Sequence, residues 1–505
     1  MLRKLRIILA VVCFVAVTLL FLDFTGTLHA WFGWLAKLQF LPAALAGSVG
    51  IVIAIVVVTL LVGRIYCSVV CPLGVMQDGF NWLGGRLHKN RHHYTRPMTW
   101  LRWTAFGLFV LLMVLGLNGL ALLLAPYSAY GRIAASLLQP VWLWINNLLA
   151  TVAERADSYA FYHVDVWLKS GVTLAVALVT LILVGFLSFR GGRTWCNTVC
   201  PVGTVLGLVS RFSLLKPVID TSKCNGCQKC ARNCKASCID PETHTIDYSR
   251  CVACMDCLDN CNQHAITFTK AKRGKCISDG DLQGEHPAEA TADMGRRQFI
   301  AITALTAAAT TIKAQEKTVD GGLAVIEDKQ IPTRTVPVRP AGSLSRKHFE
   351  NHCTACQLCV SACPNHVLRP SSDLTRLMQP EMSFERGYCR PECTRCADAC
   401  PTGAIRRIDA AEKSNIHIGL AVVVAKNCVV NTDGVNCGNC ARHCPADAIV
   451  MVPKNPGDNP DLPMTLKVPT VDENRCIGCG ACENLCPARP FSAIYVEGRD
   501  THIND

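Results

Sequence analysis

Most cysteines of this chain stand in short repeated groups whose spacing suits iron–sulfur chemistry. Two groups, "CNGCQKCARNC" and "CVACMDCLDNC", follow the pattern Cys-x2-Cys-x2-Cys-x3-Cys. Three thiolates on such a loop bind three irons of a cube, and the fourth points to a neighbouring cluster, which is typical of [4Fe–4S] ferredoxins. Zinc sites need two separated pairs instead. The eight cysteines are Cys224, Cys227, Cys230, Cys234, Cys251, Cys254, Cys257 and Cys261.

Four further groups occupy the last third of the chain, and each ends in Cys-Pro. The second has one extra residue in its first gap, and the third has a much longer first gap, so Cys428 is the least secure ligand. With the two earlier groups they predict six [4Fe–4S] clusters. The sixteen cysteines are Cys353, Cys356, Cys359, Cys363, Cys389, Cys393, Cys396, Cys400, Cys428, Cys437, Cys440, Cys444, Cys476, Cys479, Cys482 and Cys486.

Four other cysteines belong to a repeat in the first half of the chain. "GRIYCSVVCPLG" begins at Gly63 and "GRTWCNTVCPVG" at Gly192, 129 residues later. Repeats of the same topology are related by an axis along the membrane normal, which would bring Cys67, Cys71, Cys196 and Cys200 together. Three interpretations stay open: an extra metal or iron–sulfur centre on four thiolates, a redox-active dithiol pair, or small residues at a tight helix junction.

The elements that position these cysteines begin with apolar helices. Stretches at Leu5–Leu22, Pro42–Val62, Leu101–Ala125 and Gly171–Phe189 are each long enough to cross a bilayer. Cationic segments precede the first, separate the second from the third and follow the fourth. By the positive-inside rule the N-terminus and the loops after spans two and four are cytoplasmic. The net charge of +12 is therefore attributed to a membrane face, and no nucleic-acid partner is expected.

Haem is not expected as a cofactor. No Cys-x-x-Cys-His occurs, and no histidine lies inside a predicted span to ligate a transmembrane haem. Three cysteines remain outside all groups. Cys13 is interpreted as a small apolar residue of the first span, and Cys238 and Cys276 as spare thiols.

A segment in the middle of the chain resembles a bacterial export signal. In "DMGRRQFIAITALTAAATTIKA", Arg296, Arg297 and Phe299 fit the twin-arginine pattern ahead of a mildly apolar stretch. Clusters are assembled in the cytoplasm, so a domain loaded with them must cross the membrane folded, which the twin-arginine route does. We expect the signal to be retained as a fifth span, with cleavage near Ala314 as the alternative.

These features predict a fold class and domain order. We expect an α-helical membrane domain of four transmembrane helices in two repeats, followed by α+β ferredoxin-like domains that bind [4Fe–4S] clusters. The predicted ranges are a membrane domain at 1–215, a cytoplasmic two-cluster ferredoxin at 216–272, a linker at 273–294, a signal or anchor helix at 295–315 and a periplasmic four-cluster ferredoxin at 316–505.

Together the motifs resemble a pair of bacterial protein families. Residues 1 to about 270 resemble NapH, a membrane ferredoxin-type subunit with four spans, two Cys-x3-Cys-Pro motifs and two ferredoxin quartets. From about Met294 the chain is similar to NapG and MauM, exported four-cluster ferredoxins of nitrate reduction and methylamine oxidation, so the chain looks like a fusion of the two. In such four-cluster domains, the resemblance implies that the first quartet exchanges its fourth cysteine with the last, and the second with the third.

The resemblance implies a function in electron transfer. The expected protein is a bacterial inner-membrane quinol dehydrogenase component that passes electrons from membrane quinol to a periplasmic cytochrome c or molybdenum reductase. Two alternatives stay open: an accessory protein that helps to mature a periplasmic metalloenzyme, and a cysteine-based redox sensor. The sequence identifies no catalytic residue and shows no electron route from the cytoplasmic clusters to the periplasmic ones.

A quinol site is expected where a span ends. The candidates are His29, Trp31 and Trp34 on the outer side and His88, His92 and Tyr94 on the inner side. Aromatic residues at span ends also serve as interfacial anchors, which is the alternative interpretation of both groups.

Overall fold

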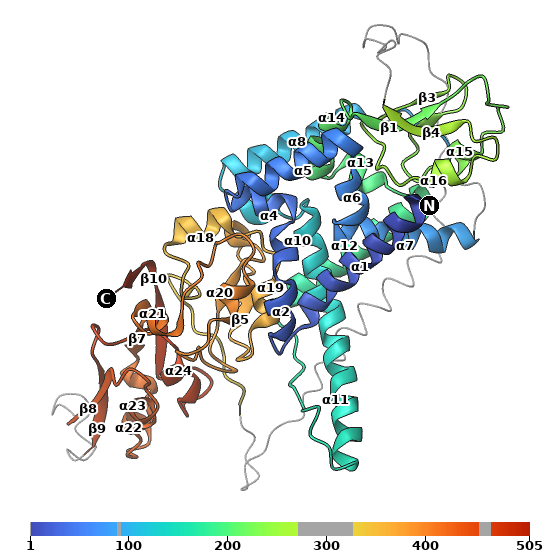
Figure 1. Cartoon of the computed structure of the whole chain (residues 1–505). Helices are drawn as coiled ribbons and strands as arrows, with labels where there is room; N and C mark the ends of the chain where they lie inside the picture. The colour runs from blue at the N-terminus through green and yellow to red at the C-terminus, as the bar shows by residue number, and fades with distance from the viewer. Residues whose placement is uncertain (1, 88–91, 271–326, 454–465, 505) are drawn as a thin grey trace, which may run out of the picture.

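The computed structural model describes residues 2–87, 92–270, 327–453 and 466–504. The predicted linker, the predicted export segment, Cys276 and His88 lie outside the described residues. We divide the described chain into a helical region (residues 2–214), a first cysteine-rich region (215–270) and a second cysteine-rich region (327–504) (Figure 1).

The helical region is built from two helices of 21 residues, Leu2–Leu22 and Gly171–Gly191, a continuous helix at Pro126–Arg155 and a series of shorter helices. The core of this region joins Leu20 and Phe21 of the first helix to Leu73, Tyr130 and Leu206. The helices are α1 (Leu2–Leu22), α2 (Thr27–Phe32), α3 (Trp34–Lys37), α4 (Phe40–Leu45), α5 (Val49–Val62), α6 (Ile65–Val69), α7 (Pro72–Leu87), α8 (Thr99–Val114), α9 (Asn118–Ala121), α10 (Pro126–Ile133), the π-helix Ala134–Leu138, α11 (Gln139–Arg155), α12 (Gly171–Gly191), α13 (Thr194–Thr198) and α14 (Pro201–Ser210).

Three helices of the described residues are long and apolar enough to cross a membrane: Leu2–Leu22, Pro126–Arg155 and Gly171–Gly191. The first and last agree with predicted spans. The predicted spans at Pro42–Val62 and Leu101–Ala125 are instead broken near Gly47 and Gly116, whose φ angles of +64° and +76° end a right-handed helix. The four-span repeat is therefore not confirmed.

The continuous helix at Pro126–Arg155 was not predicted from the sequence. It comprises α10, the π-helical turn and α11, and α11 extends away from the other helices (Figure 1). Arg132 and Asn146 interrupt its apolar run, which hid it from a hydropathy argument. Both side chains are buried, and Arg132 donates hydrogen bonds to the backbone carbonyls of Leu122 and Leu123 at 3.3 Å.

The two cysteine motifs of the helical region adopt the same local structure. Short helices α6 and α13 each carry the first cysteine of a motif, and α7 and α14 each begin at the proline after the second cysteine. A glycine with positive φ precedes each motif, Gly63 at +78° and Gly192 at +69°. The offset of 129 residues is thus kept at every one of these positions.

The first cysteine-rich region is a small α+β unit. Its antiparallel strands β1 (Leu215–Ile219) and β4 (Ile266–Lys270) pair along their length, as do β2 (Ile239–Asp240) and β3 (Thr245–Ile246). Helices α15 (Lys229–Arg232) and α16 (Asp256–Asp259) each follow a cysteine loop. The core consists largely of cysteines and small apolar residues.

The second cysteine-rich region contains two cores of similar composition. The long strands β7 (Ile416–Val423) and β10 (Ile494–Asn504) pair antiparallel and contribute to both cores. The remaining elements are α18 (Arg346–His352), α19 (Leu358–Ala362), β5 (Leu368–Pro370), the 3-10 turn Leu374–Arg376, β6 (Pro380–Met382), α20 (Arg395–Ala399), α21 (Ala410–Ser414), the 3-10 turn Ala425–Asn427, α22 (Val429–Thr432), α23 (Asn439–Arg442), β8 (Ile449–Pro453), β9 (Lys467–Val471) and α24 (Ala481–Leu485).

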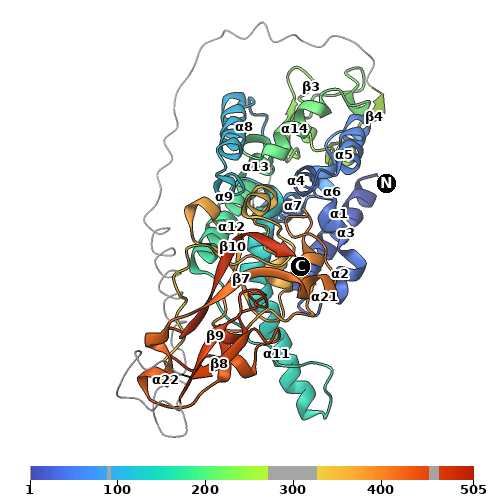
Figure 2. The ribbon, with the colours of Figure 1, turned by 90° about the vertical axis from the view of Figure 1, so that its left-hand side faces the viewer.

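The two cysteine-rich regions lie at opposite ends of the helical region (Figures 1 and 2). At the start of α1, Arg3 Nε forms an ion pair with Asp256 Oδ1 of the first region at 2.8 Å. Just beyond the end of α1, the carbonyl of Phe24 accepts from Arg395 of the second region at 2.9 Å. Since a helix of 21 residues is about 30 Å long, the two regions are separated by roughly one hydrocarbon thickness.

The second region packs tightly against α10. Ser128 Oγ donates to the carbonyl of Thr354 at 2.6 Å, and a Cβ added at Gly131 would lie 2.3 Å from the carbonyl oxygen of Cys356. The backbone of a cysteine loop therefore contacts the helix directly. Two more side-chain donors of the helical region, Asn118 and Gln139, bond to carbonyls of Glu350 and Ser361 at 2.9 and 3.0 Å.

Candidate metal centres

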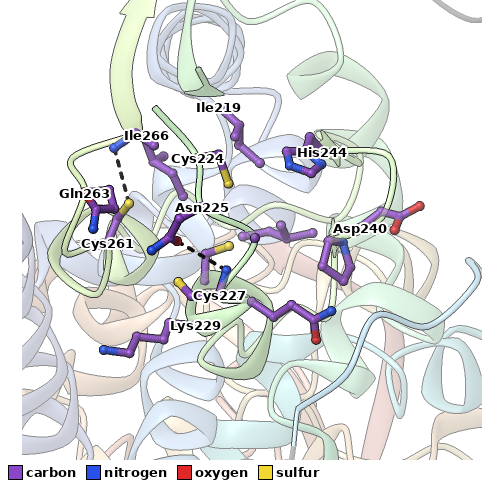
Figure 3. Close-up of a pocket in the computed structure, with 16 residues that line it drawn as sticks. Ile219, Cys224, Asn225, Cys227, Lys229, Asp240, His244, Cys261, Gln263 and Ile266 are labelled. Carbon is purple, nitrogen blue, oxygen red and sulfur yellow. Dashed lines mark hydrogen bonds between the residues drawn. The ribbon is translucent and has the colours of Figure 1, made fainter. Parts of the chain in front are cut away.

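The first cysteine-rich region encloses two cysteine-lined cavities. The first is lined by Cys224, Cys227, Cys230 and Cys261 (Figure 3), and the second by Cys251, Cys254, Cys257 and Cys234. In each cavity the fourth cysteine comes from the other motif, as in two-cluster ferredoxins. The structure thus brings together all eight cysteines that the spacing singled out here.

The backbone explains why each triplet faces one cavity. The residue after the second cysteine has positive φ in five of the six loops, for example Gln228 at +59° and Met255 at +63°. This turn folds the loop so that the third cysteine comes back over the first two. The exception is the loop with the extra residue, where Thr394 has a φ of −110°.

The fourth cysteine of several quartets accepts a backbone hydrogen bond. The donors to Cys261, Cys444 and Cys486 lie 3.3 Å from the sulfur, and the donor to Cys400 lies at 3.4 Å. Hydrogen bonds to the ligand sulfurs are a feature of iron–sulfur sites. Since thiolates are the ligands of iron–sulfur clusters, the donor set fits this cofactor. When bound, a cluster of this kind supplies one-electron transfer.

Cys238 lies at the second cavity, although it was interpreted as a spare thiol. It is buried, and its sulfur lies 3.6 Å from that of Cys234. A hydrogen bond from Cys238 lowers the pKa of Cys234, so Cys234 is the sulfur that ionises. The cavity therefore has one cysteine more than a cubane needs, and we assign Cys238 as the neutral partner.

The second cysteine-rich region brings its sixteen cysteines together in two pairs of quartets. The thiols that lie close enough to interact electrostatically show which fourth cysteine belongs to which triplet. Cys400 accompanies Cys353, Cys356 and Cys359; Cys363 accompanies Cys389, Cys393 and Cys396; Cys486 accompanies Cys428, Cys437 and Cys440; Cys444 accompanies Cys476, Cys479 and Cys482.

This pairing corrects the one that the family resemblance implied. The first quartet exchanges its fourth cysteine with the second, and the third with the fourth. The reason is the packing of short helices: α19 packs against α20, and α23 against α24. Each helix ends one or two residues before a fourth cysteine, so neighbouring helices exchange those residues.

The four quartets of the second cysteine-rich region lie one after another, starting from the helical region. The backbone N–H of Cys389 donates to the carbonyl of Cys479 at 2.9 Å, which joins the second quartet to the fourth. The first quartet lies against the helical region through Cys356, and the third lies beyond the fourth, near α22. Counted outward from the helices, the sites of the second region therefore follow the order Cys353, Cys389, Cys476 and Cys428, each named by its first cysteine.

The four cysteines of the helical region also come together. All four are 4–5% exposed, and a charge on Cys196 acts on Cys67, Cys71 and Cys200. None forms a disulfide. Within the described residues, no three His, Cys, Asp or Glu side chains converge as one metal ion would require.

The outer group of predicted quinol-site residues forms a structural cap instead. Asp23 accepts hydrogen bonds from the backbone of Gly26, Leu28 and His29 and from the His29 ring at 3.1 Å. Burial opposes ionisation of Asp23, but these bonds together hold its pKa well below its usual range. Trp31 and Trp34 are 77% and 56% exposed, as interfacial anchors are.

The inner group lies near a large cavity between the start of α1, α7 and the first cysteine-rich region. The cavity has a volume of about 1130 Å³. His92 lines it and bonds to Asn81 at 3.0 Å, whereas Tyr94 packs against Arg250 outside it. Ile7, Val11 and Phe14 form an apolar wall, and Asp78, Arg6 and Lys235 form a charged one. The charged wall could not be predicted, because its members are far apart in the chain.

Comparison with known proteins identifies the chain. Residues 352–404 and 435–489 match the 4Fe-4S dicluster domain family, and residues 44–90 and 172–219 match the 4Fe-4S binding domain family. The methylamine utilization ferredoxin-type protein MauM of Methylobacillus flagellatus is 34% identical over 168 residues, which cover 70% of that protein and 33% of this chain. The chain belongs to the MauM family of ferredoxin-type proteins.

Other members and relatives of the MauM family match in the same way. MauM of Paracoccus denitrificans is 34% identical over 183 residues, covering 79% of that protein and 35% of this chain. The ferredoxin-type protein NapG of Escherichia coli is 29% identical over 205 residues, covering 81% of it and 38% of this chain. No solved structure matches the chain significantly. The dicluster matches agree with the observed pairing of neighbouring quartets.

The fifth cysteine of the second cavity gives a first prediction. Replacing Cys238 by alanine is expected to leave the iron content of the purified chain unchanged, because Cys234 supplies the thiolate. The double variant Cys234→Ala/Cys238→Ala is expected to lose about four irons, one cubane. Anaerobic iron analysis measures both. An equal loss of iron in the single Cys238 variant would show that Cys238 is a ligand.

Proposed function

We propose that this protein is a membrane-bound iron–sulfur protein that oxidises quinol and delivers the electrons to a periplasmic reductase. In this proposal a NapH-like membrane part and a NapG- or MauM-like exported part are fused in one chain. The observation that carries it is the attachment of two cysteine-rich regions to opposite ends of one helical region.

The proposed orientation follows from charge. The N-terminal end of α1 carries Arg3, Lys4 and Arg6, and the first cysteine-rich region lies beside it. Cationic ends of spans remain on the cytoplasmic side. We therefore assign the first region to the cytoplasm and the second to the periplasm of a bacterial inner membrane. The twin-arginine segment would then take the chain across between them.

We propose that the cavity beside α7 is the quinol site. It combines an apolar wall, which suits an isoprenoid tail, with polar groups that suit a ring bearing two hydroxyls. Asn233, Lys235 and Asp256 of its lining are sequence neighbours of Cys234 and Cys257. A bound quinol would thus lie next to the second cysteine cavity.

Quinol oxidation releases two electrons and two protons. Asp78 is held as a carboxylate by Arg193 at 2.8 Å, Lys235 at 3.0 Å and Arg6, so it is a poor proton acceptor. His92 has an imidazole at the same cavity wall, and we assign it as the residue that takes a proton from the ring hydroxyl. The electrons would leave singly, since iron–sulfur clusters carry one each.

Filling the cavity tests this site. Gly79 lines it, and a Cβ at Gly79 meets no atom within 4 Å, so Gly79→Phe is expected to fit the fold while it blocks the ring. Quinol-driven reduction should fall at least tenfold, with dithionite reduction unchanged. Gly107→Phe on α8 is the matched control, because Gly107 is equally open and lies outside the cavity.

The function itself is tested on anaerobic membranes that contain the full chain. Menaquinol or ubiquinol analogues are added, and the iron–sulfur EPR signals are followed, with Cys353→Ala/Cys356→Ala as the control that removes one periplasmic site. Signals that grow with quinol support the proposal. Clusters that respond to dithionite and to no quinol would refute it and favour an accessory role in maturation of a partner enzyme.

A further inference from the structure

The cysteines of the helical region adjoin a fully buried guanidinium that pairs with no carboxylate of the described residues. Arg64 is 0% exposed. It donates to Asn197 Oδ1 at 2.9 Å, to the carbonyl of Ser249 at 3.0 Å and to that of Cys196 at 3.2 Å, and its Nη2 lies 3.9 Å from Cys67 Sγ. Arginine remains charged in proteins, and a buried charge needs a counter-charge. Among its contacts in the described part of the chain, the sulfur of Cys67 is the one able to supply it.

The second repeat places an arginine in the matching position. Arg193, 129 residues after Arg64, donates to the carbonyl of Cys67 at 2.7 Å and lies 4.0 Å from Cys196 Sγ. Each arginine thus donates a hydrogen bond to the backbone carbonyl of the first cysteine in the other repeat. Arg193 pairs with Asp78, but that carboxylate also serves Arg6 and Lys235. Lys235 also pairs with Asp256 at 3.1 Å, so among the described residues Arg64 is the cation beside the four sulfurs that lacks a carboxylate.

Neutral donors point at the sulfurs as well. The backbone N–H of Gly203 donates to Cys200 Sγ at 3.3 Å, that of Gly74 donates to Cys71, and Gln77 Nε2 donates to Cys196 Sγ at 3.2 Å. Gly203 and Gly74 allow this approach, because a Cβ there would meet the carbonyl oxygens of Cys196 and Cys67 at 2.1 and 2.3 Å. The Cys-Pro-x-Gly sequence of both motifs thus builds an N–H donor.

Three more donors lack an acceptor. Among the described residues, nothing accepts from Arg64 Nε, Arg193 Nη2 or Trp195 Nε1, and all three side chains are more than nine-tenths buried. Buried donors are nearly always satisfied in folded proteins. Their number here indicates acceptors that the polypeptide does not supply, such as the sulfides of an inorganic cluster.

We propose that Cys67, Cys71, Cys196 and Cys200 hold a seventh iron–sulfur cluster, of the [4Fe–4S] type, one thiolate to each iron. A single zinc ion is disfavoured because the side chains do not converge as one ion requires. A disulfide pair would leave the buried guanidinium of Arg64 without an anion. The match of both repeats to a 4Fe-4S binding domain family agrees with this assignment.

The position of this cluster suits an electron relay between the two cysteine-rich regions. This relay role rests on the proposed function. On one side, Asn197 donates to the carbonyl of Ala236 at 3.4 Å, and the backbone N–H of Arg193 donates to that of Lys235 at 2.7 Å. Both acceptors adjoin the second cavity of the first region. In each transfer the cluster would gain one electron from that site before passing one onward, with no bond made or broken.

On the other side, two tyrosines fill the gap to the second region. Tyr66 lies close enough to Cys71 and Cys200 to interact with their charges, and Tyr127 does so with Tyr66 and Cys356. All five residues belong to one buried core. Among the described residues no atom accepts from the hydroxyl of Tyr127, which fits a cluster sulfide at the Cys356 site as its acceptor.

Iron counting tests the proposal without a functional assay. The full chain, purified anaerobically, is expected to hold on the order of 28 irons rather than 24, seven cubanes instead of six. The variant Cys71→Ser/Cys196→Ser is expected to lose about one seventh of the iron, while Cys13→Ser, outside every group, loses none. Mössbauer spectra of the unmodified chain give the same count if the double variant does not fold.

The outcomes separate this inference from the proposed function. About 24 irons in both the unmodified chain and the double variant would overturn it, as would one zinc per chain or a disulfide found by mass spectrometry. A full iron count without any reduction by quinol would leave the seventh cluster standing and refute the proposed function. Reduction by quinol in a chain that holds only six cubanes would support the proposed function and refute the seventh cluster.

Discussion

Replacing Gly131 by alanine is expected to separate the second cysteine-rich region from the helices. The added Cβ would lie 2.3 Å from the carbonyl oxygen of Cys356 and 3.0 Å from Phe21 Cζ, and the first of these is backbone that cannot turn aside. Overpacking of this kind costs about 1–3 kcal/mol, which corresponds to a roughly fivefold to 150-fold loss of the docked state. Quinol-driven reduction of the second region should fall accordingly, with dithionite reduction unchanged.

The control for Gly131→Ala is another replacement of a helical glycine by alanine. Gly107→Ala adds a Cβ to α8, where it meets nothing within 4 Å. Alanine favours a helix over glycine by about 1 kcal/mol, so this variant should be as stable as the unmodified chain or more so. Limited proteolysis reports undocking directly. Equal protease resistance and equal reduction in both alanine variants would contradict the observed packing of α10 on the cysteine loop.

Replacing Arg64 by methionine is expected to be the most destabilising change in the helical region. The side chain bridges Asn197, Cys196 and Ser249, so its loss removes a buried cation and leaves several acceptors unpaired. Each buried acceptor that is left without a donor costs about 1–3 kcal/mol. We expect the thermal unfolding temperature of the chain in detergent to fall and the iron of the helical region to be lost.

Arg64→Lys separates the role of charge from that of shape. Lysine keeps the positive charge but cannot reproduce the fork that reaches three acceptors. It should therefore retain iron while it destabilises the chain less than methionine does. If methionine and lysine lose the same amount of iron, the charge of Arg64 does not stabilise an anionic centre. If methionine loses none, the centre does not need Arg64 at all.

The sequence was most informative where function depends on local spacing. Each cysteine triplet closes around its site within one loop, so the pattern that predicted Cys224, Cys227 and Cys230 needed no knowledge of the rest of the chain. The same holds for the repeat around Cys67 and Cys196, whose helices begin at matching positions.

The features that could not be predicted depend on packing between distant segments. The partner of Cys400 is decided by how α20 lies on α19, and the resemblance suggested a different exchange. Two predicted spans were too long because single glycines with positive φ interrupt them. The charged wall of the large cavity joins Arg6, Asp78 and Lys235, which no local pattern connects.

The structure also contains a buried core that supports the proposed electron route. Without haem, the sequence offered no connection between the two groups of predicted clusters. The core that contains Cys71, Tyr66, Tyr127 and Cys356 runs without a break from the thiol group of the helical region to the second cysteine-rich region. The proposed path is therefore continuous through protein, and no diffusing carrier between the membrane faces is required.

The most direct test of this account is freeze-quench EPR of the full chain and of its Cys71→Ser/Cys196→Ser variant after mixing with reduced menaquinol analogue. Signals of the second region are identified by their loss in Cys353→Ala/Cys356→Ala. We predict that quinol reduces both regions in the unmodified chain and only the first region in the Cys71/Cys196 variant. Equal reduction of the second region in that variant would show that electrons reach it by another route and would contradict the account.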